Sequence, residues 1–298
     1  MPLNDTIAIK KPKAQDPGPG LGEARLDVEG ITVAYEGRPA LRDFSFRLPR
    51  GARAAVVGPN GAGKSTLFKA LVGLLPLEKG RILVHGLPLG AHQDCVAYLP
   101  QRENVDWNFP VTVRDVVTMG RFGHLGWLER PGKRDRALVM DSLAQMGMEA
   151  LADRSINELS GGQQQRVFLA RALAQEPHIF LMDEPFNGVD RGTVEATMAL
   201  LDRLKRDGVT VLISTHDLNL AAERFERVLL LNKELIADGP AAEVLREGNL
   251  AKAFGSALLV SEGRRLLVDE CCGGHEDRGH EERVHGGKEA CDDEEARR

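Results

Sequence analysis

The stretch GPNGAGKS, residues 58–65, decides the fold of this chain. It fits the pattern G-x-x-x-x-G-K-[S/T], in which a glycine-rich loop wraps around phosphate oxygens. The short apolar run ARAAVVG leads into it, and STLFKALVGLL, with helical spacing, follows. The order of buried strand, loop and helix predicts a phosphate site at a helix start, where open N–H groups and the helix dipole attract anions.

Each residue type in this loop suits phosphate chemistry. Glycines let the backbone turn tightly and bring its N–H groups against phosphate oxygens. Lys64 places a positive charge on the β- and γ-phosphates, and the Ser65 hydroxyl can ligate Mg²⁺. The alternative is a glycine-rich turn with an exposed lysine. The residues expected at the nucleotide are Gly58, Pro59, Asn60, Gly61, Ala62, Gly63, Lys64, Ser65 and Thr66.

A pair of carboxylates follows a second apolar run, HIFLMDEP. Four apolar residues predict a buried strand, and Asp183 and Glu184 emerge at its carboxyl end, where open α/β sheets bind ligands. Asp183 can hold Mg²⁺ directly or through water, and Glu184 can take the proton from an attacking water. Alone, such a pair is more often a solvated loop or a helix cap, but a phosphate loop in the same chain favours the catalytic role.

The motif LSGGQQQR, residues 159–166, predicts a second phosphate contact. Ser160 can cap the helix that follows, and Gly161 and Gly162 leave the first N–H groups open. That helix leads into the Asp183 strand, so about 14 residues at about 1.5 Å each place its start roughly 20 Å away. The simplest resolution is a second copy, head to tail, whose nucleotide the motif touches; the alternative is an ordinary polar helix start.

The order of the motifs identifies a family. GPNGAGKST, LSGGQQQR, LMDEPFNGVD and ISTHD, over about residues 26–250, resemble an ABC-type ATPase subunit. The resemblance implies an α/β P-loop core with an antiparallel β subdomain and an α-helical insertion at about 103–175. It also implies ATP and Mg²⁺ as cofactors and a homodimer in which one subunit's nucleotide meets the other's signature residues, Ser160, Gly161, Gly162 and Gln163.

The same resemblance implies four further roles. Tyr35 would stack on adenine, Gln101 would touch Mg²⁺, Asp190 would lie at the dimer seam, and His216 would contact the γ-phosphate. Without the motif set, Tyr35 would be interpreted as a core aromatic and His216 as a hydrogen-bonded structural histidine.

Composition narrows the kind of ABC protein. A net charge of -5 argues against broad nucleic-acid binding, and no run of about 18 apolar residues is present to span a membrane. We see no secretory signal, so the cytosol is the default compartment. One cassette without a long heptad run resembles the separate ATPase subunit of a transporter, peripheral on the cytoplasmic face of the membrane. Its partners would be integral membrane permease subunits and, through them, an extracytoplasmic substrate-binding protein.

Residues 101–127, QRENVDWNFPVTVRDVVTMGRFGHLGW, suggest the cargo. They resemble the ATPases of manganese, zinc and iron importers, and the manganese/iron group most closely. Siderophore and cobalamin importers are the alternative, and a non-transport ATP switch acting on a soluble partner is an alternative of another class. Trp107, Phe109 and Phe122 in this segment could instead be core aromatics.

The chain divides into a lead-in at 1–25, a cassette at 26–260 and a charged tail at 261–298. The tail is interpreted either as a solvated segment or as a weak metal site that damps the ATPase. Its histidines are five residues apart, so they do not share one helix face. The candidate tail ligands are Cys271, Cys272, His275, His280, His285 and Cys291. Cys95, among strand-like residues, is predicted to be a small buried hydrophobe.

Replacing Lys64 with alanine tests the phosphate loop. Without the ammonium, Lys64→Ala should lose most of its ATP affinity, by roughly tenfold or more, because a charge-assisted contact is lost. Equilibrium binding of a fluorescent ATP analogue measures it, and wild-type affinity would contradict the assignment.

Overall fold

The computed structural model describes residues 24–91, 93–101, 110–125, 129–255, 259–262 and 265–268. The tail residues from Cys271 to Cys291, including all six candidate ligands, lie outside the described residues, as do Trp107 and Phe109. Among the residues that are described, no helix is both long enough and apolar enough to cross a bilayer.

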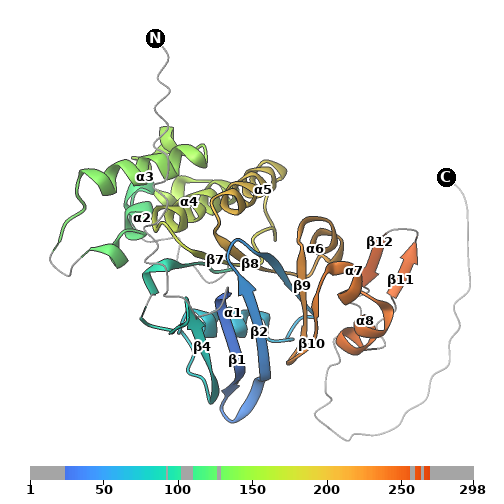
Figure 1. Cartoon of the computed structure of the whole chain (residues 1–298). Helices are drawn as coiled ribbons and strands as arrows, with labels where there is room; N and C mark the ends of the chain where they lie inside the picture. The colour runs from blue at the N-terminus through green and yellow to red at the C-terminus, as the bar shows by residue number, and fades with distance from the viewer. Residues whose placement is uncertain are drawn as a thin grey trace, which may run out of the picture.

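A six-stranded sheet forms the centre of the molecule (Figure 1). Its strands, in spatial order, are β10 (Glu234–Gly239), β9 (Arg227–Asn232), β3 (Arg53–Val57), β8 (Thr210–Thr215), β7 (Ile179–Asp183) and β6 (Val96–Leu99). All neighbouring pairs are parallel except β10 with β9. The central strands are buried along their length, which explains their continuous apolar runs. The predicted α/β core is confirmed.

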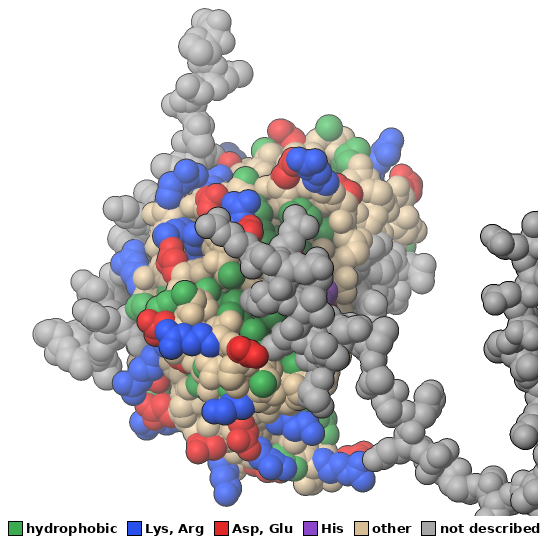
Figure 2. Space-filling model, turned by 90° about the vertical axis from the view of Figure 1, so that its right-hand side faces the viewer, with side chains coloured by type: hydrophobic (Ala, Val, Ile, Leu, Met, Phe, Trp, Pro, Cys, Tyr) green, Lys and Arg blue, Asp and Glu red, His purple; other side chains and the backbone are tan. Residues whose placement is uncertain are grey.

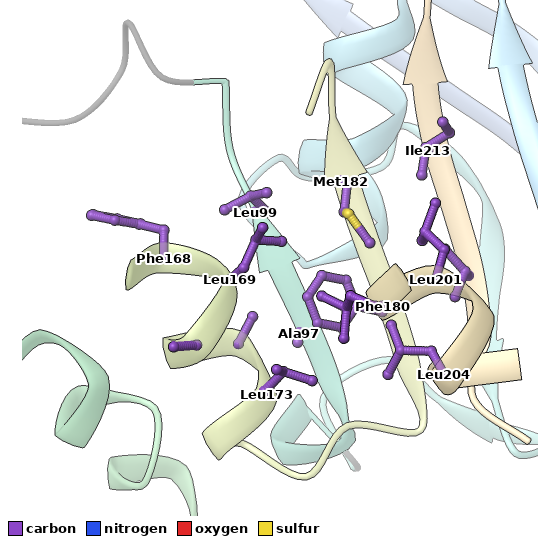
Figure 3. Packing of buried hydrophobic residues seen from close by; sticks show 14 of the residues in the cluster. Ala97, Leu99, Phe168, Leu169, Leu173, Phe180, Met182, Leu201, Leu204 and Ile213 are labelled. Atoms are coloured by element: carbon purple, nitrogen blue, oxygen red, sulfur yellow. The ribbon is translucent and has the colours of Figure 1, made fainter. Parts of the chain in front are cut away.

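The two faces of this sheet carry separate hydrophobic cores. Along β3, Ala55 and Val57 belong to one cluster and Ala54 and Val56 to the other, because successive side chains point to opposite faces. The first cluster packs against helices α4, α5, α6, α7 and α8, and Figure 3 shows its α4 and α5 side chains against β6, β7 and β8. The bounds are α4 (Gly161–Ala174), α5 (Arg191–Arg206), α6 (Leu218–Arg224), α7 (Ala241–Val244) and α8 (Glu247–Phe254).

The second cluster is covered by α1 (Lys64–Leu71) and by a separate antiparallel sheet. That sheet has the order β2 (Arg38–Pro49), β1 (Ala24–Tyr35), β4 (Lys79–Val84) and β5 (Leu87–Pro88). Its inward side chains, including Ile31 and Phe44, pack with Phe68 of α1. The predicted antiparallel β subdomain is present, and its packing on α1 anchors the helix that follows the phosphate loop.

Two further helices precede α4 between β6 and β7, namely α2 (Val113–Met119) and α3 (Lys133–Gln145). Short 3₁₀ segments occur at Gln93–Cys95, Phe122–His124, Glu149–Leu151 and Ile156–Glu158. Arg121, which is 4% exposed, connects α3 to the end of α4 through hydrogen bonds. Its guanidinium donates to Asp135 at 3.0 Å, to the carbonyl of Ala174 at 2.7 Å and to Glu176 at 3.1 Å.

Phe122 is 57% exposed, so the core-aromatic interpretation is wrong for this residue. A hairpin of β11 (Leu259–Glu262) and β12 (Arg265–Val268) crosses the boundary predicted at residue 260.

On the face drawn in Figure 2, positive and negative side chains are interspersed rather than segregated by sign.

Phe180 provides a test of the core. It is fully buried in β7, so Phe180→Ala removes a large side chain from the first cluster and should lower the free energy of unfolding by about 3–5 kcal/mol. Urea unfolding measures the loss. Leu74→Ala is the control, because Leu74 is 65% exposed and should change stability by about 0.5 kcal/mol or less. Equal effects of the two changes would contradict this packing.

Candidate functional site

A cavity of about 540 Å³ lies at the carboxyl ends of the central strands. It is lined by Ala40, Asn60, Gly61, Ala62, Gly63, Lys64, Ser65, Thr66, Gln101, Glu184, Asn187 and His216. The structure therefore brings together the phosphate loop, Gln101 and the two predicted catalytic residues, although they come from four separate parts of the sequence. Gly58 and Pro59 precede the lining residues in the same loop.

Two glycines of the loop are required by close packing. A Cβ added to Gly58 would lie 2.1 Å from the carbonyl oxygen of Leu231 in β9, so any side chain would push the loop off the sheet. Gly63 has φ +103°, and its added Cβ would lie 2.8 Å from the carbonyl oxygen of Ala40. Since Gly63 also caps α1, its unusual backbone sets the direction in which the helix N-terminus points.

Lys64 lies under the loop with only 6% of its surface exposed. Its Nζ donates hydrogen bonds to the carbonyl oxygens of Gly58 at 2.8 Å and Pro59 at 3.1 Å. The same Nζ lies 4.0 Å from Oε1 of Glu184. The ammonium is thus positioned between the loop backbone and the acidic strand end, on the wall of the cavity.

A serine of the neighbouring strand orients the acidic pair. The Ser214 hydroxyl of β8 donates to Oδ1 of Asp183 at 2.5 Å and accepts the backbone N–H of Glu184 at 2.9 Å. Asp183 is 2% exposed, so this bond meets part of the need of a buried carboxylate. Glu184 has φ +48°, an uncommon backbone for a residue other than glycine, and such outliers cluster at functional sites.

Two side chains approach the Glu184 carboxylate. Nδ1 of His216 lies 3.9 Å from its Oε2, and Nδ2 of Asn187 lies 3.4 Å from the same oxygen. The His216 side chain is 52% exposed, so it can reach a ligand in the cavity. The sequence analysis did not single out Asn187, Ser214 or Ala40; Asn187, in EPFNG, and Ser214, in IST beside His216, were adjacent to recognised motifs.

Tyr35 does not line this cavity. It ends β1, is 45% exposed and pairs with Arg38 across the β1–β2 turn. That hairpin also carries Ala40, whose carbonyl is close to Gly63, so Tyr35 and the phosphate loop belong to neighbouring surfaces. Its adenine contact stays a prediction.

The signature residues form a helix start apart from the cavity. Ser160 caps α4, its hydroxyl accepting the N–H of Gln163 at 3.4 Å while the Gln163 side chain accepts the N–H of Ser160 at 2.9 Å. The cavity lining does not include Ser160, Gly161, Gly162 or Gln163, all of which the structure describes. The helix start therefore does not contribute to the nucleotide cavity of its own chain.

Asp190 packs directly against this helix start. It caps α5, accepting the N–H of Thr193 at 3.0 Å and the Thr193 hydroxyl at 2.8 Å, and these bonds hold the pKa of Asp190 below its ordinary value. A Cβ on Gly162 would lie 1.9 Å from Oδ2 of Asp190. The glycine therefore lets the two predicted dimer elements touch within one chain.

Known proteins resemble this chain over most of its length. The family model described as "ABC transporter" matches residues 41–187. The zinc transport system ATP-binding protein TroB of Treponema pallidum is 49% identical over 248 residues, covering 82% of this chain and 93% of TroB. The chain belongs to the ATP-binding proteins of ABC transporters. It is an ATPase of that family, with nucleotide binding as the role of its cassette.

Two further comparisons support this placement. The manganese transport system ATP-binding protein MntB of Bacillus subtilis is 47% identical over 241 residues, covering 81% of this chain and 96% of MntB. A dimeric structure of a bacterial ABC transporter cassette superposes with a TM-score of 0.64 at 29% identity, covering 72% of this chain and 98% of the other. The predicted family and ATPase activity are confirmed.

Gly162→Ala tests the contact between the signature helix and Asp190. The added methyl should displace Asp190 or the helix start and lower steady-state ATP hydrolysis by roughly tenfold, while ATP binding to the phosphate loop persists. Phosphate release measures hydrolysis. Gly248→Ala is the control, since nothing lies within 4 Å of its added Cβ in α8. Wild-type hydrolysis in Gly162→Ala would contradict a functional role for this contact.

Proposed function

We propose that this chain hydrolyses ATP to drive import of a transition-metal ion through a separate membrane permease. The observation that carries the proposal is the convergence of Lys64, Gln101, Glu184 and His216 on one cavity. The metal cargo is supported by TroB and MntB, relatives named for zinc and manganese transport. Since residues 101–127 resemble the manganese/iron group most closely, manganese or iron is the first expectation and zinc the second.

The hydrolytic step uses Glu184 as the base. Its carboxylate takes a proton from a water, the water oxygen bonds to the γ-phosphorus, and the bond from that phosphorus to the β-phosphate oxygen breaks, leaving ADP and phosphate. Lys64 offsets the charge of the phosphates, and His216 donates a hydrogen bond to the γ-phosphate. The His216 and Asn187 nitrogens lie close enough to Oε2 of Glu184 to keep the carboxylate directed into the cavity.

Oxygen donors are available for Mg²⁺ beside this carboxylate. Ser65 and Gln101 line the cavity, and Asp183 ends β7 immediately before Glu184. Hydroxyl, amide and carboxylate oxygens are the ligands that Mg²⁺ prefers, so the residues fit the ion. When bound, Mg²⁺ would neutralise charge on the β- and γ-phosphates. Tyr35 would add adenine stacking from the β1–β2 hairpin.

Two copies are required to complete each site. The N-terminus of α4 offers open N–H groups to an anion, yet these residues do not line the cavity of the same chain. A head-to-tail homodimer places Ser160, Gly161, Gly162 and Gln163 on the partner's ATP, with Asp190 at the seam. The dimeric cassette structure supports this arrangement.

The permease partner docks on the cytoplasmic side of the membrane and links the ATPase to an extracytoplasmic substrate-binding protein. Met119 and Phe122, 37% and 57% exposed, lie in the segment that resembles metal importers. These two apolar side chains form a contact for the permease, because solvent-exposed aromatic and Met side chains are typical of protein interfaces.

Glu184→Gln tests the whole proposal. The amide cannot accept the proton, so the variant should bind ATP, form a stable ATP-dependent dimer and lose at least about a hundredfold in turnover. In cells lacking this chain, wild type should restore uptake of radioactive manganese or iron and Glu184→Gln should not.

Three outcomes separate the parts of the proposal. Normal turnover in Glu184→Gln would contradict the base assignment. Unchanged manganese, iron and zinc content in cells lacking the chain would contradict the metal cargo. Restored uptake of a siderophore or cobalamin alone would assign the chelate importers instead.

A further inference from the structure

Three side chains of metal-ligand type lie close together at the amino ends of β6 and β7. The nucleotide cavity lies at the other end of the sheet, beyond the carboxyl ends of the strands. His85 directly follows β4, Cys95 directly precedes β6, and His178 directly precedes β7. One ligand atom from each residue lies within 4.8 Å of the other two. They come from both sheets, so the fold and not local spacing brings them together. Cys95 is 7% exposed and belongs to the second hydrophobic cluster, which confirms the predicted small buried residue, and its thiol also lies close to the two imidazole rings.

The two histidines already have nearly the separation of ligands that share one ion. Nδ1 of His178 and Nε2 of His85 are 3.0 Å apart, and the rings are perpendicular, with an interplanar angle of 89°. In a tetrahedral zinc site, ligand atoms lie about 3.3–3.6 Å apart, given Zn–N near 2.0 Å and Zn–S near 2.3 Å. Closing the cluster therefore needs movement of about 1 Å, within reach of small side-chain rotations.

The backbone holds all three residues in place. The N–H of His178 donates to the carbonyl of Cys95 at 2.8 Å, and the N–H of His85 donates to the carbonyl of Arg25 at 2.9 Å. His85 has φ +54° because, with Gly86 at φ +77°, it forms the two-residue turn that joins Val84 of β4 to Leu87 of β5. The short turn and these two hydrogen bonds fix the backbone beside the three ligand groups, which lie within 4.8 Å of one another.

Two members of the cluster, Cys95 and His178, line a cavity of about 740 Å³, whose lining also includes Asp94, His124 and Arg25. This cavity leaves room for a fourth ligand, such as water, beside the thiol of Cys95 and the ring of His178. An open fourth position distinguishes a zinc site that exchanges its ligand from a closed structural one.

The charged side chains of Asp94 and Arg25 affect how easily the Cys95 thiol loses its proton to a metal ion. Burial and the neighbouring Asp94 raise the pKa of the Cys95 thiol to about 11, whereas Arg25 acts in the opposite direction. The thiol therefore carries its proton before an ion arrives and loses it to solvent on binding. The resulting thiolate offsets one of the two positive charges of the ion, and the nearby guanidinium of Arg25 favours the thiolate form.

We propose that His85, Cys95 and His178 bind a divalent transition-metal ion of the Zn²⁺ class, with a cavity water as fourth ligand. The proton shared between the two rings moves to the other nitrogen of its own ring, so both imidazoles stay neutral and present lone pairs. One thiolate and two imidazoles favour Zn²⁺ over Mn²⁺, which prefers oxygen ligands. The bound ion links β4 of the antiparallel sheet to β6 and β7, whose far ends carry Gln101 and Glu184.

The test uses the full-length chain with Cys271, Cys272 and Cys291 replaced by serine, so that Cys95 is its remaining cysteine. Co²⁺ serves as a spectroscopic substitute for Zn²⁺, because thiolate ligation gives a charge-transfer absorption. The serine background should bind one Co²⁺ per chain with this absorption, and Zn²⁺ should displace it. Added Zn²⁺ should also raise the Tm, since it binds the folded state.

Cys95→Ala in the same background should abolish the absorption and lower Zn²⁺ affinity at least about tenfold, while retained ATP hydrolysis shows that the chain is folded. His85→Asn, which keeps the thiol, should weaken Zn²⁺ binding similarly and serves if Cys95→Ala fails to fold. Absence of the thiolate absorption in the serine background, or its survival in Cys95→Ala, would overturn the proposal.

Tighter binding of Mn²⁺ than of Zn²⁺ would overturn the choice of ion. Because these measurements involve no permease, their failure is distinct from failure of the transport proposal.

Discussion

The parallel register of β3, β8 and β7 is the constraint on which the ATP site depends. Val57 pairs with Thr215, and Asp183 pairs with Ser214, so the carboxyl ends of three strands meet at one edge. Ser214 then bonds to both Asp183 and Glu184 across that edge. The phosphate loop follows one strand, the acidic pair another and His216 the third. A shift in any of these pairings would separate the groups that are proposed to act on one phosphate.

A second constraint follows from α4. The helix is 14 residues long, and its far end leads into β7, so its capped start is fixed at a distance from the acidic pair. Gly162 and Asp190 pack at that start, which couples the signature helix to α5. A rigid helix thus separates two halves of one reaction site within a chain. In the proposed dimer, association of two chains would bring those halves together, and opening and closing of the pair would move the permease.

The sequence predicted what depends on local pattern. Three features each occupy consecutive residues, and their residue types and spacing indicate their chemistry: the phosphate loop, the acidic pair and the capped helix. Ser214, Asn187 and Ala40 gained their roles from strand pairing and loop packing, which no local pattern encodes. The cluster of His85, Cys95 and His178 could not be predicted from a local pattern either. The two histidines are 93 residues apart in the sequence and come together only because the two sheets pack against each other. The Cys and His residues of the tail, in contrast, are close together in the sequence, so they were predicted as candidate ligands.

The central claim is that each ATP site is completed by a second copy of the chain. Mixing Lys64→Ala with Gly162→Ala tests it most directly, because a head-to-tail heterodimer would combine the intact phosphate loop of one chain with the intact signature helix of the other. Each variant alone should keep about a tenth of the wild-type rate of ATP hydrolysis or less. The account predicts that ATP hydrolysis recovers on mixing, to no more than about a quarter of the wild-type rate, since half of the dimers would carry one intact site. A mixture no more active than its separate components would contradict the account.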